Sequence, residues 1–263
     1  MSFLAVGLAA LLSAGLTLFS GFGLGTLLLP AFAFFFPLDL AVAATAVVHL
    51  ANNLFKLALV GRHAHGSTVI RFGLPAAVAA IAGAWLLERT GELEPIHRYS
   101  GLGRTLAVTP IGLALGALMV GFAILEAVPR FSKWTVAPRW LPLGGALSGF
   151  FGGFSGHQGA LRSMFLLKLG FDRRQFVATG VVCAVLVDGA RLAIYSESFL
   201  ARHLQALREG NGLALLAVAI AGAFVGSFVG SRLVEKVTLR AVQWVVAALL
   251  IAIGVGLASG AID

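Results

Sequence analysis

Charge is scarce in this sequence. Only 11% of its 263 residues are Asp, Glu, Lys or Arg, whereas soluble proteins carry about 25%. The mean hydropathy is +0.96, and apolar runs of roughly 20 residues recur along the chain, each long enough to cross a hydrocarbon layer of about 30 Å. A soluble protein of this length could not bury all of these runs in one core. We therefore predict an all-α polytopic membrane protein.

Cysteine is almost absent as well. Cys183 is the one cysteine, which excludes an internal disulfide, and its apolar surroundings predict a packed core thiol. The net charge is +8, which in a soluble protein would suggest nucleic-acid binding. Here the Lys and Arg residues stand singly or in short groups between apolar runs, as the positive-inside rule expects. We expect a lipid bilayer around the chain and no nucleic-acid partner.

Eight apolar segments can be read along the chain, and glycine-rich stretches break two of them. The segments cover residues 3–36, 40–60, 69–87, 106–125, 143–169, 176–195, 213–229 and 241–257. The breaks are Gly21-Phe22-Gly23-Leu24-Gly25 in the first segment and Gly152-Gly153-Phe154-Ser155-Gly156-His157-Gln158-Gly159 in the fifth. The longest polar connections are 88–105 and 196–212.

The chain repeats itself at an offset of 135 residues. Phe19-Ser20-Gly21 recurs as Phe154-Ser155-Gly156, Asn53 falls on Asp188, and Lys56 falls on Arg191. Three matches at one offset predict two homologous halves, 1–128 and 129–263, within one integrated membrane domain.

The distribution of charge predicts how the segments cross the membrane. If all eight segments cross, the connections on the two sides carry seven and nine Lys and Arg residues, which is no bias. If the fifth segment is a re-entrant hairpin, one side has 11 basic and 3 acidic residues and the other has 5 and 7. We therefore predict a multi-pass protein of the bacterial inner membrane. The basic connections 2-3, 4-5, 5-6 and 7-8 then lie in the cytoplasm, as the positive-inside rule expects. The repeat favours a hairpin in the first segment too, although charge does not decide whether that segment spans. Each half then has three crossings, and the halves form an inverted repeat.

Broken helices within a membrane must line a cavity or be buried in protein, because lipid cannot satisfy free backbone groups. Helices that begin near Gly25 and Gly159 would direct N-terminal N–H groups inward, where they attract anions. Glycines such as Gly23 also let a ligand approach the backbone. The alternative is that these glycines serve only close helix packing.

Polar side chains within the apolar segments point to the same region. His49, Asn52, Asn53 and Lys56 have spacings that place them on one helical face. Asp188 and Arg191 lie three residues apart, and Ser155, His157, Gln158 and Arg162 occupy the second break or follow it. Ionisable groups within a membrane are costly and indicate function. The alternatives are that Lys56 extends to the interface, that Arg191 only pairs with Asp188, and that the asparagines only join helices.

Three basic residues and one acidic residue inside the segments suit a small anion. The predicted substrate-binding residues are Arg162, Arg191, Lys56, Asn52, Asn53, His49, Ser20, Gly23, Gly25, Ser155, His157, Gln158 and Gly159. Asp188, His49 and His157 are candidates for proton coupling, because histidine titrates near neutral pH. We expect no catalytic residue, no metal and no cofactor.

Two stretches resemble the TauE/SafE sulfite-exporter family. They are Gly21-Phe22-Gly23-Leu24-Gly25 with Leu27-Leu28-Leu29-Pro30, and Leu40-Ala41-Val42-Ala43-Ala44-Thr45. The Gly-rich fifth segment is similar to the second Gly-rich opening of that family. The resemblance implies a four-plus-four duplication and a permease for sulfite, sulfonates or sulfoacetate. His157-Gln158-Gly159 stands where a longer glycine run is usual, and Arg162 replaces an apolar residue, so both differences bear on the choice of substrate.

Other functions fit parts of the pattern. An anion channel or a carrier of small carboxylates would use the same residues. Gly153-Phe154-Ser155-Gly156 matches the G-x-S-G of intramembrane serine proteases, although such an enzyme needs a histidine base near its serine. A purely structural subunit would not need the polar face of the second segment. Our prediction is a secondary transporter rather than an enzyme, with transport direction, coupling ion and homodimer formation left open.

Overall fold

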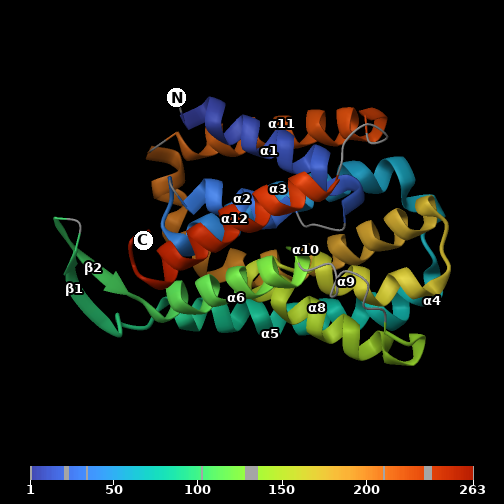
Figure 1. The fold of residues 1–263 in the computed structure, drawn as a ribbon, viewed down its shortest axis with the longest axis horizontal. Coiled ribbons are helices and arrows are strands. Elements are labelled where there is room, and N and C mark those ends of the chain that lie inside the picture. Colours follow the sequence, from blue (N-terminus) through green and yellow to red (C-terminus); the bar gives the residue numbers. More distant parts are fainter. Residues whose placement is uncertain are drawn as a thin grey trace.

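The structure is a computed structural model that describes residues 2–20, 24–33, 35–101, 103–127, 136–209, 211–233 and 239–262. Long helices dominate it (Figure 1). The α-helices are α1 (Ser2–Ser20), α2 (Leu24–Ala33), α3 (Leu38–Val60), α4 (Gly66–Thr68), α5 (Leu74–Gly91), α6 (Pro110–Ala127), α8 (Leu141–Ser155), α9 (Gly159–Leu166), α10 (Arg173–Glu209), α11 (Gly212–Leu233) and α12 (Leu239–Ala258). Shorter turns are η1 (Gly61–His63), η2 (Val69–Gly73), η3 (Pro138–Trp140) and η4 (Leu167–Leu169), and two strands are β1 (His97–Gly101) and β2 (Arg104–Val108).

The helices confirm an all-α membrane protein. In the described residues, 4 helical stretches are long and apolar enough to cross a membrane. They are Leu40–His63, Gly66–Gly91, Arg173–Tyr195 and Gly212–Gly230. Phe3–Gly15, Pro110–Leu125 and Ala247–Ala258 form shorter apolar helices.

The fifth apolar segment turns back on itself at its glycine-rich break, as predicted. Gly156 ends α8 with φ at 81°, a conformation that glycine adopts without steric cost, and α9 begins three residues later. The N–H of Val136, before α8, donates to the carbonyl of Met164, near the end of α9, at 3.3 Å. The segment therefore enters and leaves at the same end of the molecule.

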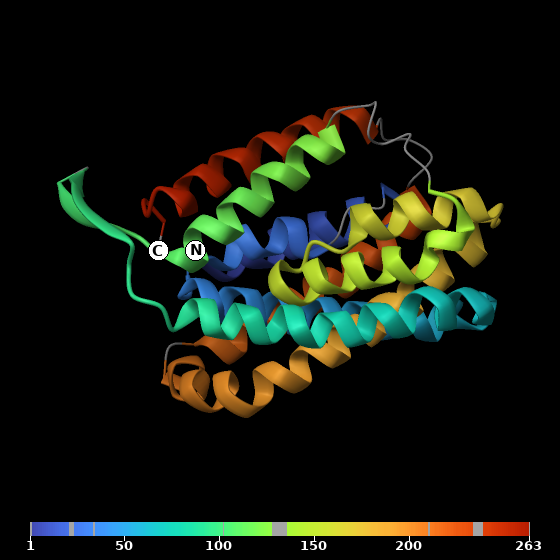
Figure 2. The ribbon, with the colours of Figure 1, turned by 90° about the horizontal axis from the view of Figure 1, so that it is seen from below.

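Within the described residues the helices pack in five main pairs, and one of these is α5 with α10 (Figures 1 and 2). α1 packs on α11 and α5 packs on α8, and within each of these pairs the contacts advance in the same direction along both helices. α3 packs on α10 and α6 packs on α12. Both pairs run antiparallel. Gly112 of α6 lies beside Leu257 of α12, and Gly116 lies beside Gly254. Asn53 of α3 contacts Asp188 of α10, and His65, which follows α3, contacts Thr179.

Rows of glycines allow the parallel pairs to approach closely. A Cβ atom on any of three glycines of α8 or three of α11 would press against a carbonyl oxygen of the neighbouring helix. These contacts are Gly145 on Phe72, Gly149 on Ala76, Gly153 on Ala80, Gly222 on Gly7, Gly226 on Leu11 and Gly230 on Gly15. Small residues spaced by four are the usual means of close helix packing in membranes. Several glycines of the second glycine-rich segment therefore serve helix packing, which was the alternative to a role in ligand binding.

Two expectations about the connections were wrong. Residues 106–108 belong to strand β2 instead of the fourth apolar segment, because the helix starts only at Pro110, where the Thr109 hydroxyl accepts from the Gly112 N–H at 3.1 Å. Residues 196–209, expected as a connection, continue α10. The antiparallel pairing of β1 with β2 makes a ribbon of the polar stretch after α5.

The connections gather at two ends. At one end, the backbone N–H of His65 donates to the Thr179 hydroxyl at 3.0 Å, and Arg71 donates to the Pro138 carbonyl at 3.4 Å. The β-ribbon lies at the other end, where the Tyr99 hydroxyl donates to the Ser259 carbonyl at 2.7 Å. The described residues 61–65, 136–140 and 167–172, which follow α3, precede α8 and follow α9, therefore lie at one end.

Candidate substrate site

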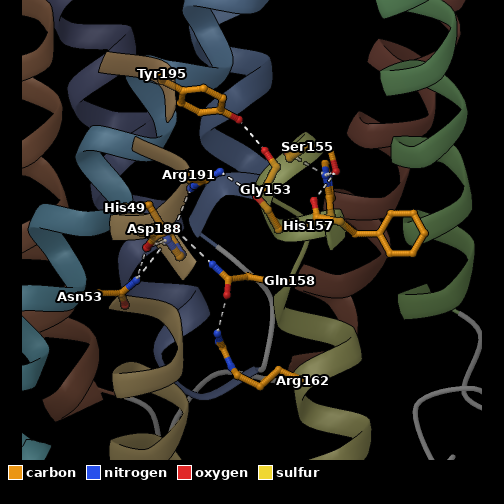
Figure 3. A network of polar contacts seen from close by, with 12 residues as sticks. His49, Asn53, Gly153, Ser155, His157, Gln158, Arg162, Asp188, Arg191 and Tyr195 are labelled. Atoms are coloured by element: carbon orange, nitrogen blue, oxygen red, sulfur yellow. Dashed lines mark hydrogen bonds and ion pairs between the residues drawn. The ribbon is translucent and has the colours of Figure 1, made fainter. Parts of the chain in front are cut away.

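A carboxylate from the middle of α10 joins three parts of the molecule. Asp188 is fully buried, and its Oδ2 lies 2.6 Å from Nδ1 of His49 on α3. The Asn53 amide, one turn further along α3, donates to the same oxygen at 3.1 Å. Gln158, at the tip of the α8–α9 hairpin, donates to Oδ1 at 3.2 Å. Figure 3 shows these side chains converging on Asp188.

Two further residues of α10 bind the end of α8. The guanidinium of Arg191 lies 2.8 Å from Oδ1 of Asp188 and donates to the Gly152 carbonyl at 3.1 Å. The Tyr195 hydroxyl donates to the Gly153 carbonyl. Carbonyls at a helix C-terminus carry partial negative charge, so Arg191 is neutralised by Asp188 and by α8 together.

Lys56 and Arg162 have no such counter-charge. Lys56 is 8% exposed, so it does not extend to the surface as the sequence allowed, and Arg162 is partly buried. Arg162 donates to the Gln158 side-chain oxygen at 3.3 Å. Among the described residues, no carboxylate lies within 4.0 Å of either side chain. Lys56 lies one turn along α3 from Asn53, and Asn53 and Gln158 both donate to Asp188, so the two cations lie on two sides of the same polar network.

The polar face of α3 serves two neighbours. His49 and Asn53 face Asp188, whereas Asn52 faces α11. The amide orientation that satisfies its surroundings lets Asn52 donate to the Ser227 hydroxyl at 2.7 Å and accept from Nζ of Lys56 at 3.1 Å. Asn52 therefore positions the Lys56 ammonium group, and all four predicted residues of this face are buried.

The start of α9 adds backbone donors to this region. No side chain caps α9 after Gln158. In the part of the chain that the structure describes, the N–H groups of Gly159, Ala160 and Leu161 have no hydrogen-bond partner. Free N–H groups at a helix start favour an anion, and Gln158 and Arg162 stand next to them.

Two predicted residues point elsewhere. The Ser155 hydroxyl donates to the Phe151 carbonyl at 3.0 Å. His157 stacks on Phe122 of α6 with ring centroids 5.3 Å apart, and Figure 3 shows both side chains on the far side of the hairpin from Asp188. Nδ1 of His157 lies 3.1 Å from the Ser155 carbonyl oxygen and hydroxyl. A nitrogen that donates to a carbonyl carries its proton and cannot serve as the base of a protease.

Most of the first glycine-rich break lies outside the residues that the structure describes. The structure describes α1 as far as Ser20 and α2 from Leu24, so the predicted break at 21–25 stays a prediction. Gly23 and the surroundings of Ser20 and Gly25 lie outside the described residues, so their part in a site stays a prediction. In the described ranges, no group of three His, Cys, Asp or Glu side chains is placed to hold a metal ion.

Three further residues, which were not predicted from the sequence, support the cluster. Tyr195 follows Asp188 by seven residues and Arg191 by four, a spacing that places it on the same helical face and could have identified it. Ser227 binds Asn52, and the Ser148 hydroxyl donates to the Gln158 carbonyl at 3.0 Å. Both serines stand among glycines and alanines with no distinguishing spacing.

A bundle of apolar helices around a buried charged cluster, with a hairpin that ends at that cluster, defines an integral membrane protein of the transporter class. Over residues 3–257 the sequence matches the family described as Sulfite exporter TauE/SafE. The chain belongs to this family and is a membrane transporter. No solved structure and no curated protein matches it.

Proposed function

We propose that this protein is a secondary transporter of a small anion, namely a sulfur oxyanion such as sulfite or an organosulfonate such as sulfoacetate. The observation that carries the proposal is a pair of cations without a carboxylate partner, the buried Lys56 and the partly buried Arg162. An unpaired charge is costly inside a protein, so a bound anion would stabilise this arrangement. Arginine suits an oxyanion because its forked donors match two oxygens.

The arrangement of the helices supports alternating access. If the halves 1–128 and 129–263 are related by a two-fold axis in the membrane plane, then α1 corresponds to α8, α3 to α10, α5 to α11 and α6 to α12. Under this correspondence the pair α1–α11 maps onto α8–α5, and both pairs are parallel. The pairs α3–α10 and α6–α12 map onto themselves, and helices related by such an axis are antiparallel, as both pairs are. We infer that one half rocks against the other around the site.

Orientation and energy coupling follow from the same features. The end with the connections 2-3, 4-5 and 5-6 carries the basic residues and is assigned to the cytoplasm of a bacterial inner membrane. His49 and Asp188 are 2.6 Å apart where the two halves meet, so a proton on this pair is our candidate for coupling. His157 is the weaker candidate because it faces Phe122.

Three alternatives differ from this proposal in features that can be measured or seen in the structure. A channel would use the same cations but would not show counter-flow. A carrier of small carboxylates would use the same charges and differ only in the anion it prefers. The serine-protease reading conflicts with the Ser155 hydroxyl, which is directed at the Phe151 carbonyl.

Flux into proteoliposomes tests the proposal. Purified protein would be offered sulfite, sulfoacetate, taurine and a carboxylate in turn, with and without a pH gradient. We expect saturable, counter-flow-competent movement of a sulfur oxyanion that Arg162→Ala abolishes in a folded protein. Lys168→Ala is the matched control, because it removes an exposed charge at the basic end. Normal flux through Arg162→Ala would remove Arg162 from the site, and unsaturable flux would favour a channel.

A further inference from the structure

The two halves differ in one charge at equivalent positions. In the second half, Asp188 and Arg191 form an ion pair of 2.8 Å three residues apart on α10. The equivalent residues of α3, at the offset of 135, are Asn53 and Lys56. Since Asn53 is neutral, Lys56 lacks the acid that its counterpart has.

The rest of the site does not supply that negative charge. Asp188 already contacts His49, Asn53, Gln158 and Arg191. Asn52 gives Lys56 a neutral oxygen at 3.1 Å, and Gln158 gives Arg162 a neutral oxygen at 3.3 Å. Within the described ranges, two positive charges therefore remain without carboxylate partners when the histidines are neutral.

We propose that the site selects a doubly negative substrate and that Lys56 determines this selection. This inference rests on the proposed function and names the charge of its substrate. A dianion neutralises both cations, whereas a monoanion leaves one buried cation uncompensated, which is unfavourable. The substrates selected in this way are fully deprotonated sulfite and sulfonates with a second acidic group. The site would disfavour sulfonates with a single charge and zwitterions such as taurine.

The site also suggests how such a substrate would lie. Arg162 and the free N–H groups at the start of α9 together suit a three-oxygen sulfur group, because both offer several donors to one anion. Lys56 acts as a point charge and suits the second negative group. Removing the Lys56 charge should therefore weaken recognition of the second group more than that of the sulfonate.

Two compounds that differ in one charged group test the inference. Sulfoacetate carries a sulfonate and a carboxylate, and 2-hydroxyethanesulfonate replaces the carboxylate by a hydroxymethyl group. We would measure kcat/KM for both in proteoliposomes with the full chain, Lys56→Gln and the control Lys168→Gln. Gel filtration of each variant in detergent would establish that it is folded.

We expect the original chain to prefer sulfoacetate by at least about tenfold, the ratio that 1.4 kcal/mol produces. Lys56→Gln should remove most of this preference while still moving 2-hydroxyethanesulfonate, and Lys168→Gln should keep it. An original chain that prefers 2-hydroxyethanesulfonate or moves both equally would overturn the inference, even if Lys56→Gln does not fold. A Lys56→Gln variant with an unchanged ratio would also overturn it. Transport with the wrong preference leaves the proposed function standing, whereas no transport of any anion removes both.

Discussion

The Asn53 amide donates to the Asp188 carboxylate at 3.1 Å across the α3–α10 contact, and these residues occupy equivalent positions in the sequence repeat. Under the proposed inverted repeat, equivalent residues touch only where the two-fold axis passes between them. The axis would then pass through the buried polar cluster. Rocking of the halves would change this contact, because it joins one half directly to the other.

Asp188 is expected to be the residue on which folding depends most. Asp188→Asn keeps the shape but leaves Arg191 buried with no carboxylate partner. Removing one member of a buried ion pair costs about 3–5 kcal/mol, so the variant should unfold at a markedly lower temperature in detergent. Glu92→Gln is the control: its exposed pair with Arg89 is of a kind that contributes about 0–1 kcal/mol. Equal thermal stability of Asp188→Asn and the original chain would contradict the role assigned to this pair.

Close packing of α8 on α5 predicts an unequal effect of the same substitution at two glycines. A Cβ at Gly149 would overlap the Ala76 carbonyl, whereas a Cβ at Gly121 of α6 meets nothing within 4 Å. Gly149→Ala should therefore destabilise the protein by about 1–3 kcal/mol, as overpacking does. Gly121→Ala should leave the stability unchanged or raise it, because alanine favours a helix. Similar melting temperatures for both variants would show that α5 and α8 do not pack as described.

Charge and glycine placement predicted more of this fold than hydropathy did. The unequal distribution of Lys and Arg predicted the hairpin, and the glycine-rich stretch before α9 located its turn at Gly156. Hydropathy gave the helices but misplaced some ends. The helix through 196–209 was missed because its residues are polar, and the β-ribbon was missed because its strands are short.

The sequence predicted which residues form the cluster better than it predicted where their side chains point. Helical spacing placed His49, Asn53 and Asp188 on buried faces, and the structure brings them together. The same spacing could not show that Asn52 turns to Ser227. His157 lies only one residue from Gln158, yet the irregular backbone at the hairpin tip directs the two side chains to opposite sides, which no regular periodicity describes.

Tyr195 is expected to hold the hairpin tip against α10. Tyr195→Phe removes the donor to the Gly153 carbonyl, which should cost about 0.5–1.5 kcal/mol and increase hydrogen exchange in residues 150–158. Transport rates should change with it, because the tip carries Gln158. Tyr99→Phe removes a similar bond, to Ser259, outside the cluster, and should affect neither the exchange of this segment nor transport. Unchanged exchange in Tyr195→Phe would mean that other contacts hold the tip.

His49 is expected to couple transport to protons. It contacts Asp188 at 2.6 Å where the halves meet, so His49→Gln should keep substrate exchange between equal pH values but lose acceleration by a pH gradient. His157→Gln should keep that acceleration, because His157 stacks on Phe122 away from Asp188. His63→Gln, at the basic end, controls for the loss of a histidine outside the cluster. The measurement is proteoliposome flux of the preferred anion with and without the gradient, alongside counter-flow in each variant. If His157→Gln loses the acceleration and His49→Gln keeps it, the coupling group is on the α6 side of the hairpin. The His49–Asp188 pair would then be a purely structural contact between the halves.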